Sequence, residues 1–259
     1  MLPYEIWLVL CREITHRYRQ PTWLVMGIAQ PCLYMIFFGP LVEKYAAYTP
    51  GFPPGGTWLM FAPALMVQMV IIGSSFVGVS LLAEYRSGVF ERFSVSPMKL
   101  TALLTGKVLA VVVSVLVQGG IIALLCVVVF GARPPVGGVA LCLLIVAVLS
   151  AAIASASYGL ALRLRSEEKM PAVLNTLLMP LFLLSGTLLP ITTELAPDWL
   201  WKLSRLNPVA YVMDADRASF RGDFSAHSLL PGTVALTLMT SLSFWWAART
   251  FARHNAGIG

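Results

Sequence analysis

Residues 108–132 read VLAVVVSVLVQGGIIALLCVVVFGA and contain no Asp, Glu, Lys or Arg. A helix that crosses a bilayer needs about 20 mostly apolar residues, because the hydrocarbon core is roughly 30 Å thick. Five other stretches of the chain are long enough and equally free of these four residue types, at 20–42, 45–83, 134–162, 170–193 and 224–248. The pattern predicts a protein built from membrane-spanning helices.

Composition supports the same prediction. Of the 259 residues, 58% are hydrophobic and only 12% are charged, which is too little polar material to cover a soluble core of this size. We therefore expect an all-α polytopic membrane protein, with residues 1–259 forming a single transmembrane domain. The six predicted transmembrane helices lie near residues 21–42, 58–83, 103–130, 137–163, 170–189 and 229–249. The second begins near Trp58 because the preceding PGFPPGG at 50–56 cannot continue a helix.

The positions of lysine and arginine predict the orientation. With the N-terminus inside, twelve of the 18 basic residues fall on the cytoplasmic side and six on the other. Both termini are then cytoplasmic, in a multi-pass protein of the plasma membrane, which in bacteria is the inner membrane. The net charge of +6 reflects this topology and does not indicate nucleic-acid binding.

The first residues suggest a helix that lies in the headgroup plane. Ile6, Trp7 and Leu10 recur on one face of residues 3–18, and Arg12 and Arg19 lie away from it. We expect an N-terminal interfacial helix at 3–18. A frayed amphipathic tail is the alternative.

The first charged segment after an apolar run is AEYRSGVFERFSVSP, residues 83–97. As a helix it would place Tyr85 and Phe90 on one side and Glu84 and Glu91 on the other. A bare loop would not need this two-faced pattern, so the segment is a candidate docking surface for a cytoplasmic partner. The alternative is a helix that rests on the lipid surface without a partner.

Two further patterns predict local structure. Between 190 and 223, aromatic residues alternate with charges, which favours short helices that dip into the outer leaflet before the sixth span, although a plain loop remains open. Small residues at 150–157 predict that the fourth span packs centrally, because they allow helices to approach closely.

Several chemistries lack their residues. The apolar runs contain no ionisable group at mid-depth to relay a proton, and sodium coupling is only disfavoured. No histidine has a nucleophile or metal-ligand pattern around it, and Gly106-Lys107 lacks the rest of a phosphate-binding loop. We therefore expect neither catalysis nor a metal or cofactor site in this chain.

Two separated motifs resemble a known family. One is EYRSGVFERFSVSP at 84–97, followed by Gly106-Lys107; the other is LSGTLLP at 184–190, followed by PDW at 197–199 and LNP at 206–208, with Tyr211 and Arg217. Together they are similar to the ABC-2 type exporter permeases of the daunorubicin-resistance and nodulation-export kind. Tyr85 and Val89 depart from the family pattern, where a charged residue and a threonine are more usual.

The resemblance implies a permease without its own ATPase site. ATP and Mg would be bound by a cytoplasmic ATP-binding cassette ATPase dimer, and the permease would pair with a second copy or a sister permease within membrane lipid. The substrate would be an amphipathic, drug-like or lipid-linked molecule that moves outward. A coupling helix between spans two and three would contain Glu84, Arg86, Gly88, Glu91, Arg92 and Pro97. An outer gate or re-entrant segment would contain Pro190, Pro197, Trp199, Asn207, Pro208 and Tyr211.

Residues along the substrate path are harder to select. Met66, Met69, Phe76 and Met179 could line an adaptable apolar route, but methionine also fills gaps in ordinary helix bundles. Two other functional classes stay open at this point. An autonomous channel or facilitator would need no ATPase partner, and a scaffold protein would transport nothing.

Overall fold

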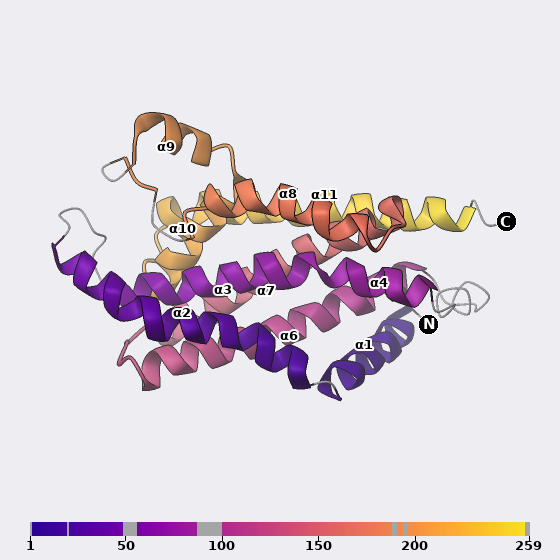
Figure 1. The fold of residues 1–259 in the computed structure, drawn as a ribbon, viewed down its shortest axis with the longest axis horizontal. Helices are drawn as coiled ribbons and strands as arrows, with labels where there is room; N and C mark the ends of the chain where they lie inside the picture. Colours follow the sequence, from indigo (N-terminus) through magenta and orange to yellow (C-terminus); the bar gives the residue numbers. More distant parts are fainter. Residues whose placement is uncertain are drawn as a thin grey trace.

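The computed structural model describes residues 2–19, 21–48, 56–86, 100–187, 191–193 and 196–256, and within these ranges it is a helical bundle without a strand (Figure 1). The predicted all-α class is therefore confirmed. The described helices are α1 (Leu2–Tyr18), α2 (Pro21–Tyr48), α3 (Thr57–Ser75), α4 (Val77–Arg86), α6 (Leu100–Val128), α7 (Val136–Leu164), α8 (Lys169–Leu183), α9 (Asp198–Ser204), α10 (Pro208–Arg221) and α11 (Ala226–Ala256).

Within the part of the chain that the structure describes, four stretches of helix are long and apolar enough to cross a membrane: Thr57–Arg86, Thr101–Val128, Val136–Leu164 and Ala226–Ala252. Each of the six predicted spans contains helix, and α2 and α8 are not among these four stretches, which are drawn from the described residues alone. Helix α8 has 15 residues, so at about 1.5 Å per residue it is shorter than a hydrocarbon core. A membrane protein is established, and the count of six spans stays a prediction.

Helix α7 is the centre of the bundle, as the small residues predict. It packs against α3, α4, α6, α8, α10 and α11. Ser150, Ser155 and Ser157 on α7 are buried, and a side chain at Gly159 would collide with Trp246 of α11. Small residues therefore set how closely the neighbouring helices approach α7.

The second predicted span is not one continuous helix. Helix α3 ends at Ser75, Phe76 separates it from α4, and a break of this kind exposes backbone polar groups. Ser157 of α7 satisfies them: its hydroxyl donates to the Ser75 carbonyl and accepts the Gly78 N–H, with an N–O distance of 2.9 Å. The break is stable inside an apolar bundle because a neighbouring helix supplies the missing hydrogen bonds.

The fifth predicted span is wrong at its outer end. It was expected to run to residue 189, but α8 ends at Leu183 and a turn follows. Pro180 lies inside the last turn of the helix, and Gly186 has a φ of 73°. Proline removes a helical hydrogen bond, and a positive φ is incompatible with a continuing right-handed helix.

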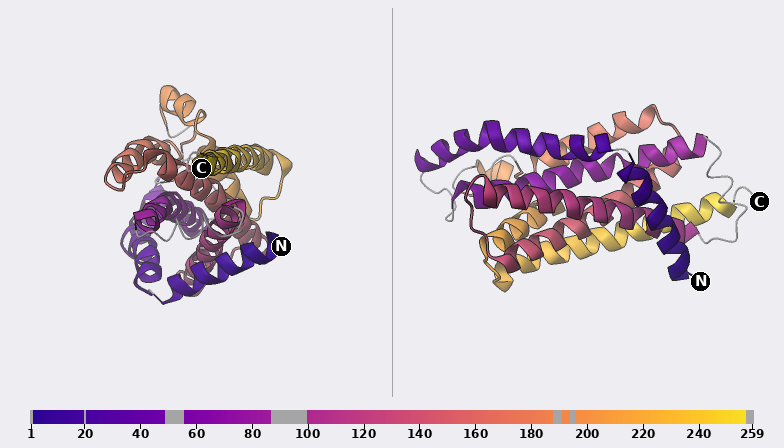
Figure 2. Two further views of the ribbon diagram at one scale, coloured as in Figure 1. Left: turned by 90° about the vertical axis from the view of Figure 1, so that its right-hand side faces the viewer. Right: turned by 90° about the horizontal axis from the view of Figure 1, so that it is seen from below.

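The first helix follows the prediction closely, since 3–18 was expected and α1 spans Leu2–Tyr18. Figure 2 shows α1 running across the bundle, steeply inclined to the other helices, and it packs on α6 and α2. Gly106 of α6 allows this contact, because a Cβ there would lie 2.6 Å from the Cβ of Val9. Its location at a membrane surface stays a prediction.

The two ends of the bundle contain different parts of the chain. The start of α1 and the end of α11 lie at one end, together with the end of α4 and the start of α6; we name this the terminal end (Figure 1). Helices α9 and α10 lie at the opposite end, named here the α10 end, and α9 projects from the bundle. Both termini are thus on one side, in agreement with an even number of crossings.

The close contact between α4 and α7 gives a stability prediction. In Gly78→Ala, the new Cβ would lie 2.5 Å from the Ser157 carbonyl oxygen, so α4 must move away from α7. We expect a loss of about 1–3 kcal/mol, the usual cost of overpacking. Thermal unfolding of the purified protein in detergent measures it.

Gly73→Ala is the matched control, because a Cβ at Gly73 of α3 meets nothing within 4 Å. That variant should keep or raise the melting temperature, since alanine favours helix over glycine. Equal losses in the two variants would contradict the proposed close packing at Gly78.

Candidate functional site

A buried lysine joins three helices at the terminal end. Lys107 lies in the second turn of α6 and its side chain is only 1% exposed. Its Nζ lies 2.8 Å from Glu13 Oε1 of α1 and 2.8 Å from Glu84 Oε1 of α4. We name these three residues the Lys107 cluster.

The energetics of the Lys107 cluster make it a strong constraint on helix position. An ammonium group has three N–H donors and is costly to bury without partners. Two carboxylates within hydrogen-bond distance compensate for this cost, and pulling either one away would leave a buried charge without sufficient compensation. Helices α1, α4 and α6 are therefore held together at the terminal end by one side chain.

A second contact ties α1 to α6. Arg17, one turn after Glu13, donates from Nη1 to the Ser114 hydroxyl at 3.3 Å. Both α1 side chains thus reach into α6, which explains why an amphipathic first helix stays packed on the bundle.

A third ion pair at the terminal end is more exposed. Arg86, the last residue of α4, lies 3.0 Å from Glu167 in the link between α7 and α8. Their side chains are 63% and 32% exposed, so water and salt weaken the attraction. This pair helps to position the end of α4 but contributes little to stability.

The structure describes two of the six predicted coupling residues. Glu84 and Arg86 lie in the last turn of α4 and make the ion pairs just described. Gly88, Glu91, Arg92 and Pro97 lie outside the described residues, as does most of the predicted coupling helix. Its assignment stays a prediction, and the structure adds only what its first two residues contact.

At the α10 end, Asn207 joins two helices through its amide. The side-chain oxygen accepts the Val209 N–H at 3.0 Å and so caps α10, while Nδ2 donates to the Leu181 carbonyl of α8 at 2.7 Å. Pro208 occupies the first turn of α10, where its missing N–H costs nothing. The Asn207-Pro208 pair therefore starts α10 and fastens it to α8.

Other contacts hold the same region. The Tyr211 hydroxyl donates to the Arg205 carbonyl at 3.0 Å, and the Ser204 hydroxyl donates to the Leu184 carbonyl at 2.9 Å. Pro197 precedes α9, and Trp199 on α9 is 66% exposed. Pro190 lies outside the described residues. The short helices expected before the last span are present as α9 and α10; their role as a gate stays a prediction.

Two charged residues on α10, Asp216 and Arg217, are buried. The topology predicted from lysine and arginine instead places both in an outer loop. Arg217 is 5% exposed and its Nη2 donates to the Gly186 carbonyl at 2.7 Å, beyond the end of α8. Asp216 is fully buried, and this burial raises the pKa of its carboxyl group well above the ordinary value, an effect that the neighbouring Cys142 thiol and the Arg217 charge partly oppose. Helix α10 is thus part of the bundle rather than a surface loop.

The four residues suggested for a substrate path separate into two groups. Met66 and Met69 are buried in the core, where Met66 Sδ lies 3.6 Å from Cys142 Sγ. Phe76 and Met179 line a cavity of about 720 Å³ between α2, α3 and α8. Its polar lining includes four uncharged residues that lie within the predicted spans: Gln30, Gln68, Asn175 and Thr176.

The functional residues that sequence reasoning missed are charged. Lys107 falls among the twelve basic residues predicted on the cytoplasmic side, and nothing in the sequence indicates that α1 and α4 bury it. Among the described residues, no three His, Cys, Asp or Glu side chains are grouped to hold a metal ion.

These features define a polytopic helical membrane protein with a charge cluster at one end and a fastened pair of short helices at the other. Comparison with known proteins gives the family: the sequence matches the ABC-2 type transporter family over residues 4–221, and the chain belongs to it. Proteins of this family are transport permeases that in general work with an ATP-binding cassette partner.

A relative supports the assignment. The chain is 27% identical over 214 residues to ycf38 of Cyanophora paradoxa, whose name describes it as a candidate transport permease. The matched region covers 82% of this chain and 73% of the relative. The resemblance drawn from residues 84–97 and 184–217 is therefore confirmed at the level of the family.

The Lys107 cluster gives a second stability prediction. In Lys107→Met, Glu13 and Glu84 lose their shared cation inside the bundle, and we expect a loss of about 3–5 kcal/mol. Arg86→Gln removes the exposed pair with Glu167 and should cost at most about 1 kcal/mol. Melting temperatures of the variants in the same detergent compare the two.

A rescue separates lost charge balance from lost packing. Adding Glu13→Gln and Glu84→Gln to Lys107→Met removes all three charges, so much of the lost stability should return. If the triple variant is as unstable as Lys107→Met, packing of the lysine stem and not the ion pairs stabilises this site.

The two roles of Asn207 can be separated by substitution. Asn207→Asp keeps an oxygen that accepts the Val209 N–H but cannot donate to the Leu181 carbonyl when ionised, whereas Asn207→Ala loses both bonds. We expect the aspartate variant to lose about 1–3 kcal/mol, because it leaves the carbonyl unpaired beside a negative charge. Thermal unfolding of both variants tests this; no loss in Asn207→Asp would show that the bond to α8 is unimportant.

Proposed function

We propose that this chain is the membrane permease subunit of an ATP-binding cassette exporter, driven by a separate cytoplasmic ATPase that grips the segment from Glu84 to Pro97. The observation that carries the proposal is the ion pair of Glu84 with the buried Lys107. Glu84 lies in the last turn of α4, directly before the segment that the resemblance assigns to coupling. A force on that segment would act on α4 first.

The contacts of α4 supply a route for such a movement. Glu84 links α4 to α6 and, through Lys107, to Glu13 of α1. Gly78, two turns earlier, is bound to Ser157 of α7, the central helix. A displacement of α4 would therefore move α1 and α6 together and would act on the centre of the bundle, since buried ion pairs and tight contacts resist separation.

The cavity between α2, α3 and α8 supports an amphipathic substrate. Its wall combines aromatic and thioether side chains, such as Phe76 and Met179, with the amides of Gln30, Gln68 and Asn175. Small-molecule sites typically combine an apolar wall with a few polar groups, and this cavity of about 720 Å³ has the appropriate size. The lining suits a drug-like or lipid-linked molecule with an apolar body and a polar part.

The remaining parts of the assembly come from the resemblance. We propose two permease copies, or this chain with a sister permease, together with an ATPase dimer that binds ATP and Mg. Outward transport across the plasma membrane, with both termini cytoplasmic, belongs to the same proposal. The common position of the two chain ends and the end of α4 is consistent with it (Figure 1).

The first test is biochemical. The tagged chain, purified from its native membranes in mild detergent, should bring an ATP-binding cassette ATPase with it. Glu91→Lys should lower the recovered ATPase at least tenfold at equal amounts of inserted chain, because a reversed charge opposes the proposed contact. Lys202→Glu, the same reversal on α9 at the α10 end, is the control and should leave recovery unchanged.

The second test distinguishes an autonomous channel. The purified chain alone in liposomes should release no trapped amphipathic dye, whereas the chain with its ATPase should move dye only when ATP is present. Passive flux without partner or nucleotide would overturn the exporter in favour of a channel. An inserted chain that recruits no ATPase and gives no flux would favour a scaffold.

A further inference from the structure

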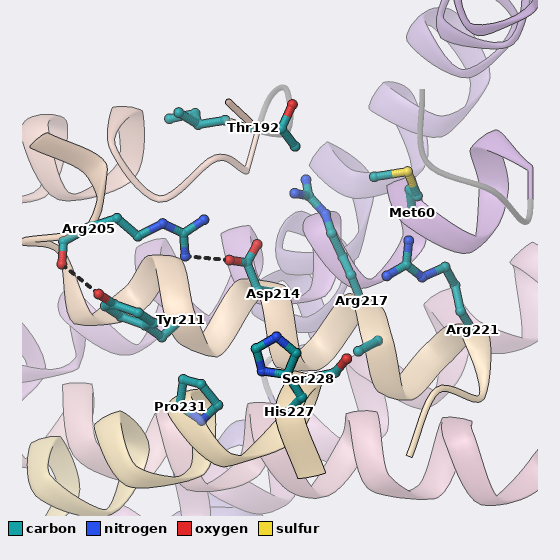
Figure 3. Close-up of a pocket in the computed structure, with 12 residues that line it drawn as sticks. Met60, Thr192, Arg205, Tyr211, Asp214, Arg217, Arg221, His227, Ser228 and Pro231 are labelled. Carbon is teal, nitrogen blue, oxygen red and sulfur yellow. Dashed lines mark hydrogen bonds and ion pairs between the residues drawn. The ribbon is translucent and has the colours of Figure 1, made fainter. Parts of the chain in front are cut away.

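A cavity of about 410 Å³ lies beside α10, at the end of the bundle away from the termini. Helix α10 contributes Tyr211, Asp214, Arg217 and Arg221, and the chain around Thr192 contributes to the opposite wall (Figure 3). None of the functions proposed above uses this cavity. Its lining differs from that of the amphipathic cavity, because it contains three arginines.

The charges around the cavity do not balance. Arg205, Arg217 and Arg221 line it, and among the described residues Asp214 is the one acidic member of the lining. Asp214 is already paired, since its Oδ2 lies 2.8 Å from Arg205 Nη1. Among the described residues, Arg217 and Arg221 have no carboxylate at ion-pair distance, although Asp214 acts electrostatically on Arg217 and Asp223 on Arg221.

Two further carboxyl groups lie near this wall. Asp223 attracts Arg221 and accepts a hydrogen bond from Ser228 of the lining, which reduces the excess of three arginines over the acidic lining residue but does not remove it. Asp216 on α10 is buried beneath the wall, and burial favours the neutral form of its carboxyl group. His227, at the start of α11, can only add positive charge. The cavity therefore keeps a positive potential.

Unsatisfied donors around the cavity also indicate a missing partner. Thr192 Oγ1, Arg205 Nε and Arg217 Nε are buried and have no hydrogen-bond partner among the described residues. Arg217 is 5% exposed, and Figure 3 shows its guanidinium group extending from α10 toward Thr192. Buried N–H groups nearly always have partners, so three open donors around one cavity form a pattern that needs an explanation.

Water alone would satisfy these donors but would not neutralise the charge. An oxyanion would do both, because each of its oxygens accepts several hydrogen bonds and guanidinium groups bind phosphate through paired N–H donors. One guanidinium group is enough to bind a carboxylate, whereas a phosphate can bind two guanidinium groups and a hydroxyl at once. The cavity volume leaves room for a phosphate group together with the atoms attached to it.

We infer that this cavity is a binding site for a phosphate-type oxyanion, held by Arg217, Arg221 and Thr192. Either the headgroup of an anionic phospholipid or a free phosphate ion supplies this chemistry. The inference does not depend on transport. Only a further role, in which the site receives an anionic headgroup of the cargo as it leaves, rests on the proposed exporter function.

The test uses Arg221→Gln, because Arg221 lines the cavity and is partly exposed at the end of α10. Lys202→Gln is the control: it removes one exposed positive charge from the same end, and Lys202 does not line the cavity. The full-length purified proteins are delipidated in a neutral detergent. No ATPase partner is needed, so a failed exporter proposal leaves this test intact.

Two arms identify the source of the oxyanion. In the first, inorganic phosphate is titrated and the rise in melting temperature gives an affinity. In the second, native mass spectrometry counts phosphatidylglycerol against phosphatidylcholine bound per chain. In the arm that detects binding, we expect Arg221→Gln to weaken it about tenfold, because one charge-assisted hydrogen bond is lost. Lys202→Gln should bind as the unaltered protein does.

Each result is decisive. Binding of inorganic phosphate supports a free-ion site, and preference for phosphatidylglycerol without phosphate binding supports a headgroup site. If neither phosphate nor phosphatidylglycerol is preferred, or if Arg221→Gln and Lys202→Gln weaken binding equally, the inference is overturned. Arg221→Lys keeps the charge but loses the paired N–H donors, so its affinity should lie between those of Arg221→Gln and the unaltered protein.

Discussion

The structure depends on the need to satisfy every polar group that an apolar bundle buries. Lys107 is the most demanding case, because its ammonium group is 1% exposed and lies among helices of high hydropathy. Two carboxylates from two different helices solve this problem, and in doing so they fix the positions of α1 and α4. The same requirement, in a milder form, explains the hydroxyl of Ser157 at the helix break and the amide of Asn207 between α8 and α10.

This requirement explains why polar contacts, rather than apolar ones, decide which helices move together. Apolar side chains gain little by exchanging lipid for protein, so they allow many arrangements of neighbouring helices. A buried ion pair or a capped carbonyl allows one arrangement. The helix nearest the proposed ATPase contact, α4, has both kinds of bond, to Lys107 at its end and to Ser157 at its start. A displacement of α4 should therefore move the helices bound to it, because side-chain rearrangement cannot absorb the movement.

Sequence predicted much of the fold because long apolar runs leave helices as the main way to satisfy the backbone. The prediction of α1 was accurate to one residue at its start, and small residues at 150–157 correctly placed α7 at the centre. The helix break at Phe76 was missed because it depends on a partner, Ser157 of α7, which supplies the hydrogen bonds there. The early end of α8 was also missed, although Pro180 and Gly186 favour it locally, and Ser204 and Asn207 add contacts from distant parts of the chain. A single run of residues contains no information about such partners.

The candidate sites were less accessible to sequence reasoning, and charge is the reason. Counting lysines and arginines by side of the membrane treats each as a surface group, which is correct for Arg86 and incorrect for Lys107 and Arg217. Burial of these two depends on which helices pack beside them, and each has a different solution. Lys107 has two carboxylates at 2.8 Å, whereas Arg217 donates to backbone carbonyls and interacts with Asp214 and Asp216 without an ion pair. The charge of Lys107 is therefore balanced within the chain. The α10 end keeps a positive charge, for which we infer an anionic ligand.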